Sequence, residues 1–163
     1  MIKIIFGPMG AGKSEEILRI CKRYELARKK VLYISPKIVG KTISSRNGNS
    51  VNSINELKKN TDGYDIICID EAQFFDESII EYVDDQANKG KIVIISSLDG
   101  DFKKQTFGHV AKLIPLAEEV IKLSGICYIC GKEAHFSKKL DNSLDDINKE
   151  KYITVCRQHF FKK

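Results

Sequence analysis

The stretch "IKIIFGPMGAGKS", residues 2–14, joins an apolar run to a glycine-rich turn and then to a helical pattern. Its last eight residues match G-x-x-x-x-G-K-[ST] at every fixed position, between a strand and a helix as the motif requires. The glycines let consecutive backbone N–H groups curl around one phosphate, and the N-terminus of the following helix adds partial positive charge. The stretch therefore predicts that the chain binds a nucleoside triphosphate.

Within this loop the two polar side chains have separate expected partners. Lys13 is expected to reach the β- and γ-phosphates of ATP, while the Ser14 hydroxyl is expected to bind the Mg²⁺ of Mg-ATP. The predicted nucleotide-binding residues of the loop are Gly7, Pro8, Met9, Gly10, Ala11, Gly12, Lys13 and Ser14.

The rest of the chain alternates between strand and helix patterns. Residues 14–29 and 76–90 have helical periodicity, and shorter helices are expected at 53–60 and 109–117, the latter interrupted by Pro115. The runs that predict strands are 2–6, 31–35, 64–70, 91–100 and 118–124, of which 2–6 and 64–70 are expected to be buried. Such alternation predicts an α/β fold: a P-loop domain with a mostly parallel, RecA-like sheet covered on both faces.

Residues 37–50, rich in Ser, Asn and Gly, are expected to form a loop. The 163 residues fit one domain with a small appendage, and 42% of them are apolar and 30% charged. No apolar run is long enough for a membrane span, and Lys3 is unlike the start of a secretory signal, so we expect a cytoplasmic protein without membrane association. The net charge of +5 is too small to require a nucleic acid partner.

The stretch "CIDEAQFF", residues 68–75, places two carboxylates side by side at a strand end. P-loop proteins need a second anchor for Mg²⁺, usually an Asp at the end of a neighbouring strand, and Asp70 is the candidate. Adjacent side chains on an extended chain point to opposite faces, so Glu71 is expected to face the phosphoryl acceptor. It would polarise a water in an ATPase or take a proton from a substrate hydroxyl in a kinase, and these two residues leave both possibilities open.

Aromatic side chains follow several of the predicted strands, at the edge where ligands bind to an open parallel sheet. Because a flat base needs such faces for stacking, they are candidates for a base-binding pocket. Met9 and Leu98 are candidates for apolar walls of the same pocket. The aromatic candidates are Phe74, Phe75, Phe102 and Phe107.

The C-terminal quarter has a different pattern. "CYIC" (127–130) and "CRQH" (156–159) give C-x₂-C, a 25-residue gap and C-x₂-H, which predicts a closed, structural zinc site. Its expected ligands are Cys127, Cys130, Cys156 and His159. We expect two units, a nucleotide-binding domain over 1–124 and a zinc-binding element over 125–163. The other two cysteines, Cys21 and Cys68, are expected to be small buried hydrophobes.

Taken in order, "GPMGAGKS", "IDEAQFF", "LDGDF", "FGHVAKLIPLAE" and the C-x₂-C…C-x₂-H tail resemble the cytosolic type of thymidine kinase over nearly the whole chain. The resemblance implies transfer of the ATP γ-phosphate to the 5′-hydroxyl of thymidine, and also of deoxyuridine, in DNA precursor salvage. It implies that Glu71 is the base, that Asp70 serves Mg²⁺ and that Gln73 lies in the nucleotide site. It also implies that Phe102 and Tyr152 line the thymine pocket.

The same resemblance implies a lasso over the nucleoside within the 25-residue gap, a homotetramer, and inhibition by the end product dTTP. The chain departs from the family pattern at two places. It has "DDINKEKY" (145–152) where the family has a Gly-Gly pair before its Tyr, near the base contacts expected at 147–149. It also lacks the Asp-x-Arg common after the second strand, although "SSRNG" (44–48) resembles the segment that follows.

Two other functions are compatible with these motifs. One is a nucleic-acid-stimulated P-loop ATPase with a zinc ribbon, which the P-loop, "IDEA" and the basic charge permit. A helicase, however, would need a second motor domain, for which 163 residues leave no room. The other is a non-enzymatic nucleotide-binding module held by zinc.

Overall fold

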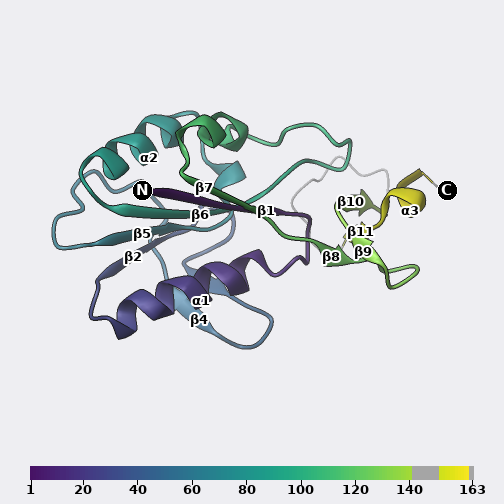
Figure 1. Cartoon of the computed structure of the whole chain (residues 1–163), viewed down its shortest axis with the longest axis horizontal. Helices are drawn as coiled ribbons and strands as arrows, with labels where there is room; N and C mark the ends of the chain where they lie inside the picture. The colour runs from purple at the N-terminus through teal and green to yellow at the C-terminus, as the bar shows by residue number, and fades with distance from the viewer. Residues whose placement is uncertain (141–150, 162–163) are drawn as a thin grey trace.

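The computed structural model describes residues 1–140 and 151–161, and its largest unit is a five-stranded parallel sheet (Figure 1). The strand order is β2-β5-β6-β1-β7, so β6 lies between the strand before the phosphate loop and the strand before the paired acids. The strands are β1 (Ile2–Gly7), β2 (Val31–Ile34), β5 (Ile66–Ile69), β6 (Ile92–Leu98) and β7 (Glu119–Lys122). The predicted α/β fold with a mostly parallel sheet is confirmed.

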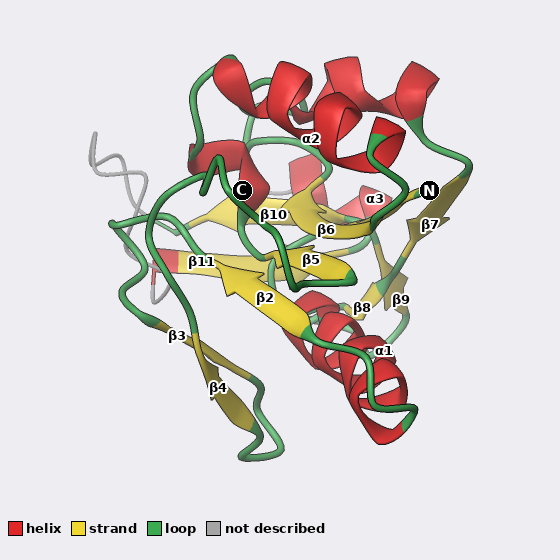
Figure 2. Cartoon of the chain, turned by 90° about the vertical axis from the view of Figure 1, so that its left-hand side faces the viewer, coloured by secondary structure: helices red, strands yellow, loops and turns green. Residues whose placement is uncertain are grey.

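Alternate side chains of each central strand enter two separate apolar layers. In β1, Ile4 and Phe6 pack on one face of the sheet and Ile5 on the other. Because residues i and i+2 of a strand share a face, a continuous apolar run supplies both layers, as expected for a sheet covered twice. Figure 2 shows the resulting three layers, with α1 on one side and α2 on the other.

The helices follow the predicted periodicity, with shorter bounds. Helix α1 (Lys13–Leu26) begins directly after Gly12, and α2 (Ser78–Asn88) carries Ile79 and Val83 into the layer on the opposite face. Two short 3₁₀ helices follow strand ends: η1 (Ala72–Phe74) and η2 (Val110–Leu116). Pro115, which lacks an N–H group, lies inside η2, which continues to Leu116, so the interruption predicted there does not occur.

The loop expected over 37–50 is in part a β-hairpin, and that prediction was wrong for its second half. Strands β3 (Thr42–Ser44) and β4 (Ser50–Asn52) pair antiparallel, with Ile43 opposite Val51. Ile43 is buried against α1 and the sheet. The turn between the strands contains Asn47 and Gly48, and Gly48 has φ +87, a conformation that suits a tight hairpin. Burial of Ile43 and the Asn-Gly turn therefore stabilise a hairpin in this otherwise polar segment.

The short helix expected over 53–60 was also wrong. The segment runs as bends, and Ile54 forms an isolated parallel bridge with Ile34 beside the edge strand β2. Ile54 and Leu57 pack against the core, so their spacing of three reflects two core contacts rather than a helical turn. The free edge of β2 thus has a backbone partner along part of its length.

The C-terminal element lies beyond the carboxyl ends of the parallel strands (Figure 1). It has its own small core of Cys127, Ala134, Val155 and Cys156. It comprises β8 (Gly125–Ile126), β9 (Glu133–Ala134), β10 (Phe136–Lys139), β11 (Tyr152–Val155) and α3 (Arg157–Phe161). The base contacts that the resemblance implies at 147–149, within the lasso, fall outside the described residues. Within the described ranges, every helix is too short or too polar to cross a membrane.

Candidate active site

The phosphate loop connects β1 to α1 and has the backbone that its glycines allow. Gly10 and Gly12 have φ +76 and +83, conformations that residues with side chains rarely adopt. The Lys13 ammonium group is buried and donates a hydrogen bond to the carbonyl oxygen of Pro8 at 2.9 Å. This bond holds the lysine across the mouth of the loop, where a phosphate would meet it.

The Met9 peptide in the middle of the loop is held by two strands of the C-terminal element. Its N–H donates to the Ser137 hydroxyl at 3.0 Å, and its carbonyl oxygen accepts a short hydrogen bond from the Thr154 hydroxyl. Ser137 lies on β10 and Thr154 on β11, and they are directly opposite each other in the antiparallel pair. The phosphate loop is therefore clamped by the element that carries the cysteines.

Asp70 lies at the floor of the site and is 4% exposed. Its two carboxylate oxygens accept hydrogen bonds from different elements: Oδ2 from the Ser14 hydroxyl at 3.0 Å, and Oδ1 from Ser96 on β6. Ser14 lies in the first turn of α1, so the bond joins the end of the phosphate loop to the end of β5 across the intervening strand. A hydroxyl and a carboxylate in contact are oxygen donors of the kind that Mg²⁺ prefers.

Glu71 turns away from Asp70 because of its backbone. It has φ +52, the left-handed region that is unusual for a residue with a side chain. Strand β5 ends at Ile69, so the two acids diverge through this turn and not through the strand alternation expected from the sequence. The buried Glu71 carboxylate accepts a hydrogen bond from the Gln73 amide at 2.6 Å. The two adjacent acids consequently have separate partners.

Gln73 is fixed at its other end by the carboxyl end of β6. Its side-chain oxygen accepts hydrogen bonds from the Ser97 hydroxyl at 2.9 Å and the Leu98 N–H at 3.1 Å. The amide orientation is thereby set, and with it the direction in which the Glu71 carboxylate points. The motifs do not predict Ser96 and Ser97. Two serines near the end of an apolar strand could nevertheless have indicated hydrogen bonds to the acids that follow β5.

A cleft of about 1060 Å³ opens above these groups. This is at the upper end of typical ligand sites and leaves room for a nucleotide and a second small molecule. Arg46 and Thr154, which the motifs do not predict, also line it. The predicted site residues in its lining are Met9, Gly10, Gly12, Lys13, Ser14, Glu71, Gln73, Phe74, Leu98 and Tyr152.

The other predicted residues lie behind or beside this lining. A Cβ on Gly7 would approach the Leu123 carbonyl oxygen to 2.9 Å, so Gly7 permits close packing at the base of the loop. Pro8 accepts the Lys13 bond, and the Ala11 N–H donates to the Pro8 carbonyl at 3.3 Å. Asp70 lies behind Ser14. Phe102 contacts the cleft wall through the ring of Tyr152, with 6.3 Å between centroids.

The four candidate aromatics have different surroundings. Phe74 faces the cleft and packs edge-on against Phe107, with ring centroids 5.5 Å apart, whereas Phe75 packs against the core. Phe102 lies on the loop after β6. Lys104 of the same loop is fastened to α3, since its ammonium is 4.0 Å from the ring centroid of Phe161. This cation–π contact ties the Phe102 loop to the C-terminal element.

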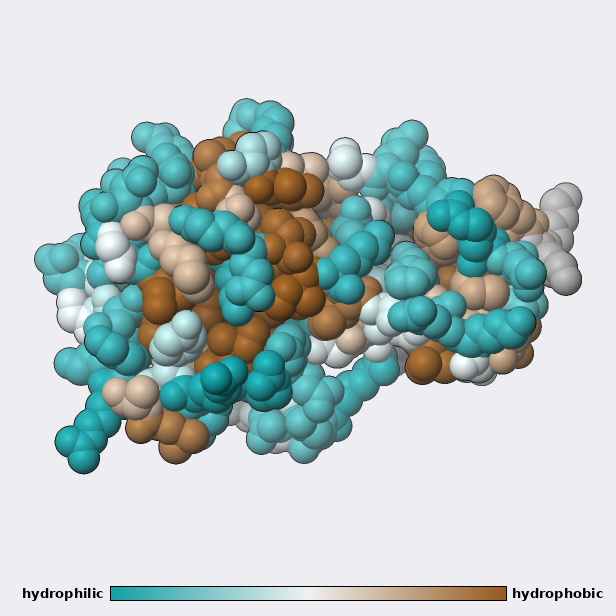
Figure 3. All heavy atoms as spheres, in the orientation of Figure 1, coloured by the Kyte–Doolittle hydropathy of each residue, from teal (hydrophilic) through white to brown (hydrophobic). Residues whose placement is uncertain are grey.

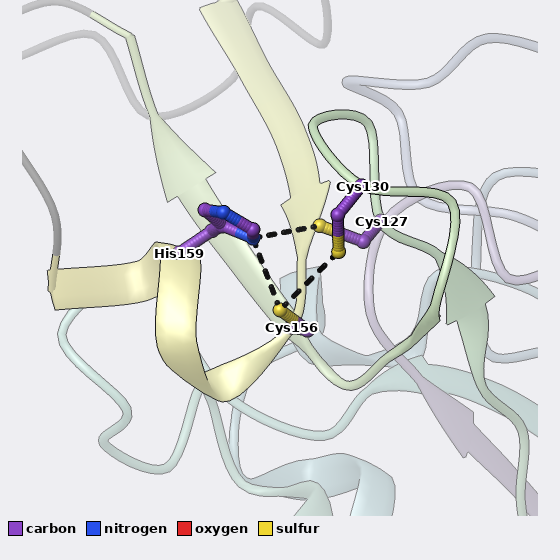
Figure 4. Close-up of side chains that lie close together, drawn as sticks. All are labelled: Cys127, Cys130, Cys156 and His159. Carbon is purple, nitrogen blue, oxygen red and sulfur yellow. Dashed lines mark hydrogen bonds between the residues drawn. The ribbon is translucent and has the colours of Figure 1, made fainter.

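The four predicted metal ligands come together in that element (Figure 4). Their donor atoms all lie within 4.8 Å of one another, with Cys130 Sγ 3.8 Å from Cys156 Sγ and His159 Nδ1 3.2 Å from Cys156 Sγ. Tetrahedral zinc with Zn–S bonds of about 2.3 Å would place its sulfur ligands about 3.8 Å apart. Three thiols and one imidazole at these spacings fit a structural zinc ion.

The Cys127 thiol in this cluster has a lowered pKa. Burial opposes the thiolate, but hydrogen bonds from the backbone of Cys156, Cys130 and Ile129 outweigh it and lower the pKa of Cys127 to about 6. A metal-binding cysteine must be deprotonated. By contrast, burial raises the pKa of Cys68 well above its usual range, as expected for an inert core thiol.

Comparison with known proteins agrees with this geometry. A sequence profile described as "Thymidine kinase" matches residues 1–160. The chain belongs to the thymidine kinase family. The resemblance of its motifs to that family is thereby confirmed, and the family extends over both the sheet and the C-terminal element.

Relatives within the thymidine kinase family come from several kinds of organism. The thymidine kinase of Yaba monkey tumor virus (strain VR587) is 43% identical, over 99% of this chain and 94% of that protein. The cytosolic thymidine kinase of Cricetulus griseus is 36% identical, over 99% and 74%. That of Mycoplasmoides gallisepticum is 40% identical, over 97% and 80%.

A solved structure with low sequence identity has a similar fold. Domain III from the Thermotoga maritima replication initiation protein DnaA superposes with a TM-score of 0.51 at 21% identity. The match covers 75% of this chain and 54% of that one. At this identity the likeness concerns the fold alone.

The contact between Gly108 and Gln73 yields a stability prediction. Gly108 has φ +62, and a Cβ there would lie 2.3 Å from the Gln73 carbonyl oxygen. Gly108→Ala should therefore lower the free energy of unfolding by about 2–4 kcal/mol, measured by urea denaturation. Gly90→Ala is the matched control, because Gly90 has φ +82 but no described atom within 4 Å of an added Cβ. It should cost only about 1 kcal/mol, and equal losses would contradict the contact.

Proposed function

We propose that this chain is an ATP-dependent thymidine kinase that transfers the γ-phosphate of ATP to the 5′-hydroxyl of thymidine and gives dTMP. The observation that carries the proposal is that the Glu71 carboxylate and the phosphate loop face the same cleft. A phosphoryl donor and its acceptor must meet in line, and a shared cleft allows this. Relatives named thymidine kinase, matching nearly the whole chain, support thymidine as the acceptor.

On the donor side, the backbone N–H groups of Gly10, Gly12, Lys13 and Ser14 and the Lys13 ammonium bind the triphosphate. Ser14 and Asp70 would hold the Mg²⁺ of Mg-ATP. Their direct hydrogen bond of 3.0 Å supports this, since two oxygens this close can ligate one cation. When bound, the cation neutralises charge on the β- and γ-phosphate oxygens.

On the acceptor side, Glu71 takes the proton of the 5′-hydroxyl as a general base. Gln73 acts through Glu71: its amide donates to the carboxylate oxygen Oε2 and thereby orients the carboxylate. Because Ser97 and Leu98 hold the Gln73 oxygen, the amide cannot rotate away without losing two hydrogen bonds. We propose that this network positions the base before substrate arrives.

The thymine ring binds between apolar and aromatic side chains at the same end of the sheet. Met9, Leu98 and Phe74 line the cleft, which supports their role as walls. Phe102 and Tyr152 contact each other, which supports a shared role at the base. Deoxyuridine, which differs from thymidine by one methyl group, is a second acceptor.

The C-terminal element binds one structural Zn²⁺ through Cys127, Cys130, Cys156 and His159. We propose a nucleotide-binding domain over 1–124 and a zinc-binding element over 125–163, which is supported by the separate core of the latter. Within the described part of this element the core has four buried residues, so the metal supplies much of its stability.

We further propose that the enzyme acts in DNA precursor salvage in the cytoplasm, as a homotetramer inhibited by dTTP. The assembly is supported by the apolar side chains that gather on the face shown in Figure 3. Val120 of the edge strand β7 is 44% exposed, and Ile114 and Leu116 of the preceding η2 are 45% and 36% exposed. The mass of the protein in solution tests this directly.

The competing function is an ATPase stimulated by nucleic acid. It is disfavoured because the enclosed acceptor side carries Glu71 with its own orienting amide, and because the family profile covers nearly the whole chain.

The substrate decides between the two functions. Purified protein with Mg-ATP should convert thymidine to dTMP, convert deoxyuridine as well, and be inhibited by dTTP, as measured by chromatography of the products. Deoxyadenosine, deoxycytidine and deoxyguanosine are the comparison substrates, and single-stranded DNA should not increase ATP consumption. Stimulation by DNA with no product from thymidine would overturn the proposal.

Replacing the base tests its role. Glu71→Gln keeps a side-chain oxygen that can accept the Gln73 bond but removes the proton acceptor, so kcat should fall about 10²–10⁴-fold. ATP binding, measured by calorimetry, should change little. Glu77→Gln, an exposed carboxylate paired with Lys112, is the matched control and should keep full activity. Transfer at the wild-type rate by Glu71→Gln would exclude Glu71 as the base.

The metal can be measured without any assay of activity. Elemental analysis of protein prepared without chelator should find one zinc per chain, and Cys127→Ser or Cys156→Ser should lose it. In these variants proteases should cleave the C-terminal element before the sheet. Cys68→Ala, a buried cysteine outside the cluster, should retain zinc. A wild-type preparation free of zinc would refute the site.

A further inference from the structure

Arg46 lies at the tip of the β3–β4 hairpin, with its guanidinium group against the phosphate loop. A Cβ built on Gly10 would be 3.1 Å from Nη2 and 3.5 Å from Nη1 of Arg46. The absence of a side chain at Gly10 therefore makes room for this group. Arg46 lines the same cleft as Lys13, Ser14 and Glu71.

The hairpin tip is tied to the helix that follows the phosphate loop. The Asn47 amide donates to Glu15 Oε1 at 2.8 Å, and Glu15 is in the first turn of α1. Within the turn, the Ser45 N–H donates to the Asn49 carbonyl at 2.8 Å. Ile43, three residues before Arg46, is buried in the layer that α1 covers. These contacts set the position of Arg46 relative to the loop.

Arg46 has no carboxylate partner in the described residues 1–140 and 151–161, where it forms no salt bridge or hydrogen bond. The two acids in the lining of the cleft have other partners: Glu15 accepts from Asn47, and Glu71 accepts from Gln73. The guanidinium is exposed to solvent, so it stays hydrated without a partner. A cation held beside a phosphate cradle, with no anion of its own, is suited to an anionic ligand.

The chemistry of the donor calls for such a group. A triphosphate carries more negative charge than one lysine and one divalent cation neutralise, and in phosphoryl transfer that charge spreads over the γ-phosphate oxygens. The planar guanidinium donates two parallel hydrogen bonds to phosphate oxygens, which a lysine cannot do. An arginine supplied from within the same chain is a known way to stabilise this transition state.

We propose that Arg46 binds the γ-phosphate of the nucleoside triphosphate and stabilises its charge during transfer. The proposal rests on the kinase function stated above and adds a second cation to its donor site. Arg46 touches the reacting group itself, opposite Lys13, and the β3–β4 hairpin is the element that delivers it. The segment thus has a direct role in phosphoryl transfer.

Nucleotide affinities and turnover of Arg46→Gln and Arg46→Lys test the assignment. In Arg46→Gln, affinity for ATP should fall about 10-fold or more while affinity for ADP stays within about 3-fold, by calorimetry, because only ATP has a γ-phosphate. The kcat for thymidine should fall about 10²-fold or more. Arg46→Lys should be intermediate, since it keeps the charge without the bidentate geometry.

Lys41→Gln is the matched control, because it removes one exposed positive charge at the base of the same hairpin. It should leave the ATP-to-ADP affinity ratio and kcat unchanged. An unchanged ratio and kcat in Arg46→Gln would overturn the proposal, as would an equal loss of affinity for ATP and ADP. If the wild type phosphorylates no thymidine, the kinase function fails, yet the affinity ratio still decides the role of Arg46.

Discussion

The backbone of Met9 joins the phosphate loop of the sheet domain to the C-terminal element. Both of its polar backbone atoms bond to hydroxyls of opposed residues, Ser137 and Thr154, on β10 and β11. Thr154 is two residues before Cys156, and its carbonyl accepts the N–H of Tyr128, next to Cys127. Strand β11 therefore connects the cysteine–histidine cluster directly to the phosphate loop. The proposed zinc and nucleotide sites should share their stability, because contiguous hydrogen bonds connect the cysteine–histidine cluster to the phosphate loop.

Strand β6 fixes Asp70 directly and Glu71 through Gln73. It separates β1 from β5 in the sheet, and its last residues lie beneath both carboxylates. Ser96 bonds to Asp70, while Ser97 and Leu98 bond to the Gln73 oxygen. The left-handed turn at Glu71 costs about 1–3 kcal/mol and persists only where its surroundings fix it. This network supplies that support, so the strain at Glu71 is maintained by the core of the sheet.

The sequence predicted most of the fold, because continuous apolar runs such as 2–6 and 64–70, alternating with helical patterns, are typical of buried strands in a parallel sheet. The phosphate loop and the cysteine spacing were equally readable, since their chemistry requires fixed intervals. The β3–β4 hairpin was missed because strands of three residues have too little alternation, although Asn47-Gly48 was a signal. Ser137 and Thr154 carry no motif, as a hydroxyl that meets a distant peptide can lie anywhere in a chain. Contacts of this kind depend on the tertiary structure alone.

The charged groups of the site differ in exposure because some have their partner within the protein and one has its proposed partner in the ligand. Lys13, Asp70 and Glu71 are buried, and each has a hydrogen-bond partner within the protein when no ligand is bound. An unpaired guanidinium at that depth would cost several kcal/mol whenever no triphosphate was bound. On the exposed hairpin, Arg46 is hydrated in the free protein and exchanges water for phosphate only when the ligand arrives. Its place at the surface is thus the one that a phosphate-binding arginine without a permanent counterion should occupy.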